Sequence, residues 1–148
     1  MREKKKMLAA DFRIFVSEKY FRDMVKKDGF LEHEENFGRL YGTPKKFIDR
    51  WLGENKSVLL SIDVKGAMKV KRQYPDQSVL IFIMPPSLKA LKERLHFRQS
   101  EDKSAILARL KIAKKEMAYK TKYDYTVVND RLDTAYKRLK KIVVSELN

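Results

Sequence analysis

Short apolar runs alternate along the chain with longer segments whose apolar residues recur every three or four positions. The runs at 58–63, 79–84 and 126–128 have the length and β-branched content of strands. The first two are largely apolar, so both of their faces are expected to be buried, as in a parallel sheet. Strands that alternate with helices predict an α/β fold in which at least three parallel strands form a layer between helices.

The segments with helical periodicity predict helices at 17–29, 44–52, 66–73, 87–97, 106–117 and 133–147. Ser17 and Ser87 stand where a side-chain oxygen can cap the first turn of a helix. Pro44 is expected at the first helical position, with Thr43 before it as the cap. Gly66 is expected to open the helix that the Tyr-Pro pair at 74–75 ends. The chain is therefore predicted to be one α/β domain without repeats or a linker.

The composition is that of a soluble globular domain. The chain has 148 residues, a length at which roughly two-thirds of the unfolded surface is buried. It has no cysteine, which excludes disulfides and thiolate metal sites and fits a reducing compartment. No apolar run reaches the roughly 20 residues that span a bilayer, and the basic start lacks the apolar core of a secretory signal. A cytoplasmic protein without a membrane contact is expected.

The excess of basic residues calls for an anionic partner or for a role in solubility. Lysine and arginine number 34 against 20 acidic residues, which gives a net charge of +14. Many of them lie in one stretch: Lys89, Lys92, Arg94, Arg98, Lys103, Arg109, Lys111, Lys114, Lys115, Lys120 and Lys122. A solvated helix face and a site for phosphate-rich nucleotides both explain this stretch. Nucleic acid is the less favoured partner, because no helix-turn-helix, RNP or zinc-finger signature accompanies the charge.

Three motifs follow one another along the chain. They are FLEHEENFGRLYGTP at 30–44, LLSIDVKGA at 59–67 and YDYTVVND at 123–130. In this order they resemble the guanylate kinase family, and the resemblance covers nearly the whole chain. The 148 residues contain no Gly-x-x-x-x-Gly-Lys-Ser/Thr loop, whose backbone amides and lysine hold the phosphates of ATP in that family.

The resemblance implies a GMP site. Glu32 takes the role of the carboxylate that accepts from the guanine N1–H and 2-amino groups, and Thr43 that of the hydroxyl on the acceptor side. Tyr41 would donate its phenol to the monophosphate, and Asp63, at the end of its strand, would lie beside the base. Adenine would leave these groups unpaired and would therefore be rejected.

Each of these residues also has a purely structural interpretation. Glu32 could be a solvated loop carboxylate, and Tyr41 could be a core aromatic residue. Thr43 could cap the following helix, alone or in addition to its contact with guanine. Asp63 could cap the turn at Gly66.

The resemblance also implies a basic lid over the triphosphate. Arg94, Arg98 and Arg109 would face the transferring phosphoryl group and neutralise its charge, or they would form a charged helix face. Asn129 matches the place where the family contacts the adenine side of ATP, and it could instead end a strand and start a turn.

No acid–base pair or metal site is predicted. Glu34 and Glu35 are interpreted as surface residues, because kinases of this type work mainly by positioning and charge neutralisation. His33 and His96 have no partner at the spacing of metal ligands. The family implies ATP and Mg²⁺ as cofactors, but the 148 residues do not include the loop that would bind the phosphates.

The fold implied by the resemblance is a three-layer, P-loop-kinase-like parallel sheet flanked by helices and missing its first strand. A GMP-binding subdomain is expected at 11–57, the core at 58–86 and 123–148, and a helical lid with further helices at 87–122. The missing strand would leave a place between the strands at 58–63 and 79–84. A partner chain, a second copy, or the closing of the two strands on each other is expected to fill it.

Several positions depart from the family pattern. The Ser-x-Thr-Thr-Arg-x-x-Arg segment that supplies two arginines to the GMP phosphate is absent, and Arg13 stands in place of a phosphate-binding tyrosine. Ser61 replaces a residue that is usually acidic, and Gln99 replaces the lid glycine. The hypothesis is a GMP-binding relative of guanylate kinases that is inactive or very weak alone. The alternative is a non-catalytic module that binds phosphopeptides or helices in the former GMP groove.

Overall fold

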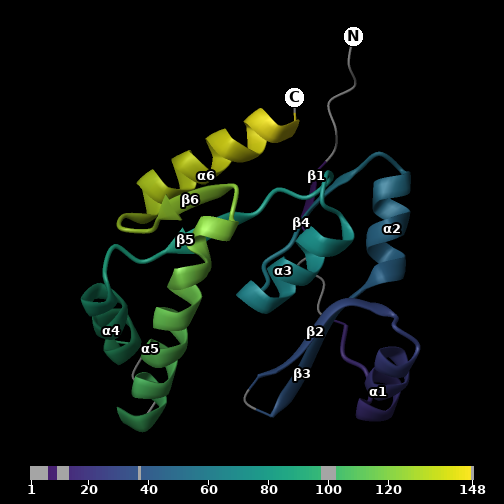
Figure 1. Ribbon diagram of the computed structural model, residues 1–148, viewed down its shortest axis with the longest axis horizontal. Coiled ribbons are helices and arrows are strands. Elements are labelled where there is room, and N and C mark those ends of the chain that lie inside the picture. The colour runs from purple at the N-terminus through teal and green to yellow at the C-terminus, as the bar shows by residue number, and fades with distance from the viewer. Residues whose placement is uncertain (1–6, 10–13, 37, 98–102, 148) are drawn as a thin grey trace. The chain divides into compact units, whose positions relative to one another are not determined.

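The computed structural model describes residues 7–9, 14–36, 38–97 and 103–147. The chain forms two compact units, residues 1–78 with 147–148, and residues 79–146. Each unit contains both strands and helices (Figure 1), so the predicted α/β class is confirmed. None of the described helices is long and apolar enough to cross a bilayer.

The first unit combines a parallel strand pair, a β-hairpin and helices. Its elements are β1 (Met7–Ala9), α1 (Glu18–Lys26), β2 (Phe30–Asn36), β3 (Arg39–Pro44), α2 (Lys45–Gly53), β4 (Ser57–Leu59) and α3 (Val64–Gln73). Ser17 caps α1 as predicted, since its hydroxyl oxygen accepts the N–H of Tyr20 at 3.2 Å. Asp63 caps α3 in the same way, through the N–H of Gly66 at 2.7 Å.

The core of the first unit joins the hairpin to two helices. Leu31 of β2 packs against Ile48 of α2 and Val70 of α3, and all three are buried. Partly buried apolar side chains surround them: Trp51, Leu52, Val58, Leu60, Ile62 and Tyr74. Removing a buried leucine from such a cluster costs about 2–5 kcal/mol. This cluster therefore joins the hairpin to α2 and α3.

The second unit contains a parallel strand pair and helices. Its elements are β5 (Ile81–Met84), α4 (Leu88–Phe97), α5 (Lys103–Met117), the 3₁₀ helix η1 (Ala118–Lys122), β6 (Tyr125–Val128) and α6 (Leu132–Leu147). Ser87 caps α4 as predicted, since its hydroxyl accepts the N–H of Ala90 at 3.0 Å. Phe82 and Val127 are buried across the strand pair, and the Phe82 ring meets the Tyr123 ring edge-on at 4.9 Å.

The ends of several elements differ from the prediction. The predicted strand at 58–63 is only the three-residue β4, and the residues after it leave the strand to reach the cap of α3. Pro44 ends β3 and precedes α2, so it is not the first helical residue. The helix expected to open at Gly66 begins at Val64, because the carboxylate of Asp63 caps it two residues earlier than the glycine suggested.

The strands pair differently from the expected layer. In the described part of the chain they form three two-stranded sheets, β1 with β4, β2 with β3, and β5 with β6. The parallel pairing expected of an α/β layer is found within each unit, in β1–β4 and in β5–β6. β1 was not predicted, and it pairs in parallel with β4 from Met7 opposite Ser57 to Ala9 opposite Leu59. A neighbour of β4 thus comes from the N-terminal segment of the same chain.

Candidate functional site

The first sequence motif folds as an antiparallel hairpin, although no strand was predicted there. Gly38 turns the chain between β2 and β3 with a φ of +72°, a conformation that glycine adopts without strain. A β-bulge interrupts the register between Phe30 and Glu32. Bulges re-aim side chains, and this one allows Phe30 to stack on Phe21 of α1 at 4.6 Å while Leu31 enters the core.

Buried Glu32 and partly buried Thr43 form a pair across the hairpin. They lie opposite each other in the strand register, and the Thr43 hydroxyl donates to Glu32 Oε1 at 2.6 Å. Glu32 is only 8% exposed, and among the described residues it is the one buried polar or charged side chain. It is therefore not a solvated loop carboxylate. Thr43 does not cap α2, which begins after Pro44 without a side-chain cap.

Asp63 lies close to the same pair. A Cβ placed on Gly66 would be 3.1 Å from Glu32 Oε2 and 3.2 Å from Asp63 Oδ1, so both carboxylates flank this glycine. Asp63 also caps α3, which confirms its structural interpretation. The cap uses Oδ1 and leaves the other carboxylate oxygen for a further partner.

Glu34 joins this group although it was expected at the surface. It lies two residues after Glu32 on β2, so the two side chains share a face of the strand. Glu34 Oε1 accepts from Lys65 Nζ at 3.0 Å. This bond, with a smaller contribution from a hydrogen bond to Asp63, holds the pKa of Glu34 below its usual value. The alternation of glutamates at 32 and 34 could have revealed it, but only once β2 was recognised as a strand.

Side chains of α3 cover the free edge of β2. Gln73 Nε2 donates to the carbonyl of Leu31 at 3.3 Å, and Lys69 Nζ donates to that of His33 at 3.5 Å. With Lys65 they are spaced four residues apart, so they form one row along α3. The row satisfies edge carbonyls and fixes Glu32 relative to Gly66.

Tyr41 lies on the same face of the hairpin as Thr43, two residues away on β3. It is 45% exposed, so it is not a core aromatic residue. Gly42 between them faces the opposite side, where a Cβ would come within 2.8 Å of the Phe30 ring. The Tyr-Gly-Thr sequence therefore packs one face of the hairpin and leaves two hydroxyl groups on the other.

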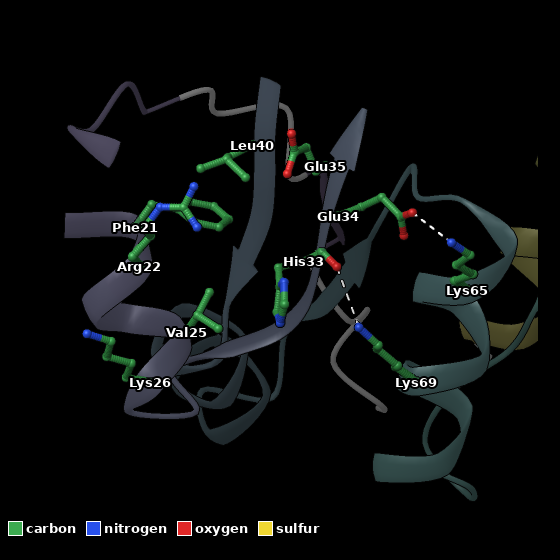
Figure 2. A pocket seen from close by; sticks show the side chains of 10 residues that line it. All are labelled: Phe21, Arg22, Val25, Lys26, His33, Glu34, Glu35, Leu40, Lys65 and Lys69. Atoms are coloured by element: carbon green, nitrogen blue, oxygen red, sulfur yellow. Dashed lines mark hydrogen bonds and ion pairs between the residues drawn. The ribbon is translucent and has the colours of Figure 1, made fainter. Parts of the chain in front are cut away.

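A hollow of about 540 Å³ lies on the α1 side of the hairpin, and Figure 2 shows its lining side chains coming from α1, the hairpin and α3. They are Phe21, Arg22, Val25, Lys26, His33, Glu34, Glu35, Leu40, Lys65 and Lys69. The four residues predicted to bind GMP do not line it. The predicted GMP site is therefore not this hollow.

In the second unit, Arg94 is anchored by the backbone. Its Nη1 donates to the carbonyl of Asn129 at 2.7 Å and its Nη2 to that of Asp130 at 2.9 Å. The N–H of Asn129 in turn donates to the carbonyl of Met84 at 2.7 Å. Arg94 and Asn129, two of the predicted site residues, are thus brought together at the carboxyl ends of β5 and β6. This is the edge at which open α/β sheets bind ligands.

The other predicted residues of the lid are less completely defined. Arg109 lies on α5 and is partly buried. Arg98 lies outside the described residues, as do Arg13 and Gln99. In the described ranges no group of three histidine, aspartate or glutamate side chains is arranged to hold a metal ion.

Comparison with known proteins decides the family. The model of the guanylate kinase family matches residues 9–146. The chain belongs to the guanylate kinase family. The guanylate kinase of Clostridium perfringens is 43% identical over 132 residues, which cover 89% of this chain and 61% of that protein. The guanylate kinase of Caldanaerobacter subterraneus subsp. tengcongensis is 41% identical over 132 residues, which cover 89% of this chain and 64% of that protein.

The structural comparison agrees. The crystal structure of guanylate kinase from Anaplasma phagocytophilum matches with a TM-score of 0.75 and 28% identity, over 95% of this chain and 76% of that one. The predicted family and its P-loop-kinase-like fold are thereby confirmed. Guanylate kinases bind GMP and ATP and transfer a phosphoryl group between them. This chain spans about three-fifths of the length of its curated guanylate kinase relatives.

Proposed function

We propose that this chain binds GMP through Glu32, Thr43, Tyr41 and Asp63, as the nucleotide-selecting part of a guanylate kinase. The hydrogen-bonded pair of buried Glu32 and partly buried Thr43 carries the proposal. A carboxylate that is 8% exposed and whose described hydrogen-bond partner is a neutral hydroxyl is costly to keep, unless it has a task. Accepting two guanine donors is such a task, because guanine presents N1–H and the 2-amino group side by side.

Thr43 would change its hydrogen-bond partner when guanine binds. In the free protein its hydroxyl donates to Glu32 at 2.6 Å. Once guanine satisfies Glu32, the hydroxyl can rotate and donate to guanine O6, because a hydroxyl has one donor and rotates freely. Adenine has an amino group at this position and neither an N1–H nor a 2-amino group, so it offers Glu32 neither of guanine's two donors and offers Thr43 no O6 acceptor. The pair can thus recognise guanine, and in the free protein its two side chains hydrogen-bond to each other.

Tyr41 and Asp63 complete the proposed site. The phenol of Tyr41 is accessible on the face shared with Thr43, where it can donate to the phosphate of GMP. Asp63, whose Oδ1 caps α3, can also accept from the guanine amino group or from the ribose. Lys65 lies beside Glu34 and Asp63 and offsets part of their negative charge. An anionic nucleotide can therefore approach two carboxylates.

Phosphoryl transfer requires ATP, and the residues of this chain provide only part of its site. Arg94, Arg98 and Arg109 would neutralise charge on the transferring group, and Asn129 would contact the adenine side. The 148 residues do not contain the glycine-rich loop that holds the β- and γ-phosphates. The residues of this chain therefore do not form a complete site for ATP–Mg²⁺. We expect the chain to bind GMP without phosphorylating it.

Titration of the purified chain with nucleotides by calorimetry tests the proposal. GMP is expected to bind at least ~10²-fold more tightly than AMP, because AMP lacks the N1–H and 2-amino donors that guanine offers to Glu32. IMP, which lacks only the 2-amino group, is expected to lose ~10-fold, the value of one hydrogen bond to a charged group. Equal affinities for the three nucleotides would rule out the guanine reader. Binding of a phosphopeptide with no affinity for nucleotides would instead establish the interaction module.

Gly66 offers a test of the geometry. In Gly66→Ala the new methyl group would lie 3.1–3.2 Å from the carboxylates of Glu32 and Asp63, and such overpacking costs about 1–3 kcal/mol where the neighbours cannot move. GMP affinity is expected to fall ~10-fold, while unfolding changes little because alanine favours the helix by up to ~1 kcal/mol. Gly53→Ala is the matched control, since nothing lies within 4 Å of its Cβ position. An unchanged GMP affinity in Gly66→Ala would place guanine elsewhere.

A further inference from the structure

The basic stretch of the second half forms a lysine-lined groove between two helices. α4 and α5 lie side by side (Figure 1) and enclose a hollow of about 470 Å³. Its lining consists of two leucines and four lysines: Leu88, Lys89, Lys92, Leu110, Lys111 and Lys114. Among the described residues, no acidic side chain lines it. We call this surface the lysine groove.

The lysine groove is separate from the arginines proposed to act on phosphates. Successive residues of a helix are rotated by ~100°, so Arg94 lies ~200° from Lys92 around α4 and Arg109 lies ~200° from Lys111 around α5. Both arginines therefore project away from the groove. Arg94 is in addition held by the carbonyls of Asn129 and Asp130. The lysines thus have no part in the proposed phosphoryl site.

The four lysines form no ion pair with the carboxylates of the described residues. The floor between them is apolar and accessible, because Leu88 is 37% exposed. Leu107 is 64% exposed and lies four residues before Lys111, so it extends the apolar strip by one helical turn. Positive charge on both sides of an open apolar strip is the pattern of a docking surface.

We propose that the lysine groove binds an amphipathic helix of an acidic partner protein. A helix that places leucines in the groove and glutamates or aspartates along both sides would cover the strip and pair with both rows of lysines. A second copy of the chain is disfavoured, because each copy carries a net charge of +14. A nucleic acid is disfavoured by the floor, which offers leucines where single strands need aromatic rings for stacking.

Fluorescence anisotropy with a labelled model helix tests this inference. The probe has leucines at helical spacing flanked by glutamates, and a scrambled peptide of the same composition is the control for charge alone. The double variant Lys92→Glu/Lys111→Glu reverses one charge on each side of the groove. It is expected to weaken binding of the probe by at least ~10-fold, because each reversal replaces an attraction by a repulsion. The matched control Lys137→Glu/Lys140→Glu has the same net charge and changes two exposed lysines of α6.

Support for the groove requires three results together. The probe must bind more tightly than the scrambled peptide, the α6 variant must retain its affinity within ~2-fold, and Leu88→Ser/Leu107→Ser must weaken it. Equal binding of the scrambled peptide, or an equal loss in the α6 variant, would show that only overall charge attracts the probe. Tighter binding of an oligouridylate with the same dependence on Lys92 and Lys111 would assign the groove to nucleic acid. GMP affinity should be unchanged in all these variants. The test of the lysine groove is therefore independent of the test of the GMP site.

Discussion

Glu32→Gln is expected to lower the affinity of the chain for GMP by at least ~10²-fold, since two hydrogen bonds to a charged group are worth ~1.5–3 kcal/mol each. Glutamine has nearly the shape of glutamate, and its amide oxygen can still accept from the Thr43 hydroxyl. Its amino group, however, would face the donors of guanine. The variant thus keeps the packing of the hairpin and removes only the acceptor pair. Calorimetric titration with GMP and AMP measures the change.

Glu35→Gln is the matched control for this experiment. Glu35 belongs to the same strand and is exposed, so its substitution removes the same charge without touching the proposed site. Its GMP affinity is expected to remain within ~2-fold of the wild type. Thermal unfolding of both variants verifies that the hairpin persists. Wild-type GMP affinity in Glu32→Gln would falsify the assignment of Glu32 as the guanine reader.

Local signals in the sequence predicted the helices well. Ser17 and Ser87 cap α1 and α4 as expected, because a cap depends on one side chain and the next three amides. The paired strands β5 and β6 were also predicted from their apolar runs. The start of α3 was predicted two residues too late, because the helix begins after its cap Asp63 and not at Gly66.

The hairpin and the β1–β4 pairing were missed for a different reason. β2 contains Glu32, His33, Glu34 and Glu35 in succession, so no alternation of apolar and polar residues marks it as a strand. Its stability comes from the tertiary contacts of Leu31 and from the α3 side chains along its edge. Strand pairing between distant segments leaves no local trace in either strand, which is why β1 could not be foreseen.

The predicted site likewise combines residues that the sequence motif indicated with residues that only tertiary packing brings together. The motif placed Glu32, Thr43 and Tyr41 together, and the strand register brings the first two into contact. It did not indicate that Glu34 and Lys65 would join them, because these residues meet only when α3 packs on the edge of β2. A motif identifies the residue types that chemistry requires, whereas packing decides which further charges surround them.

The chain of 148 residues is expected to show no turnover above background in a coupled assay with GMP, ATP and Mg²⁺. Kinase-like transfer depends on groups that hold and neutralise the phosphates, and the loss of one such group costs ~10³–10⁵-fold in rate. The 148 residues contain no Gly-x-x-x-x-Gly-Lys-Ser/Thr motif, which would supply the amides and the lysine for this task. The guanylate kinase of Clostridium perfringens, assayed in parallel, shows that the reagents support turnover.

The same sample must bind GMP by calorimetry, so that the absence of turnover is not mistaken for the absence of folding. Binding without turnover would show that guanine recognition does not require the residues needed for phosphoryl transfer. Glu32, Thr43, Tyr41 and Asp63 lie in one unit, and Arg94, Arg109 and Asn129 lie in the other. A rate comparable to that of the clostridial enzyme would show that other residues of this chain hold ATP, and Arg94→Ala and Arg109→Ala would then identify whether these arginines take part.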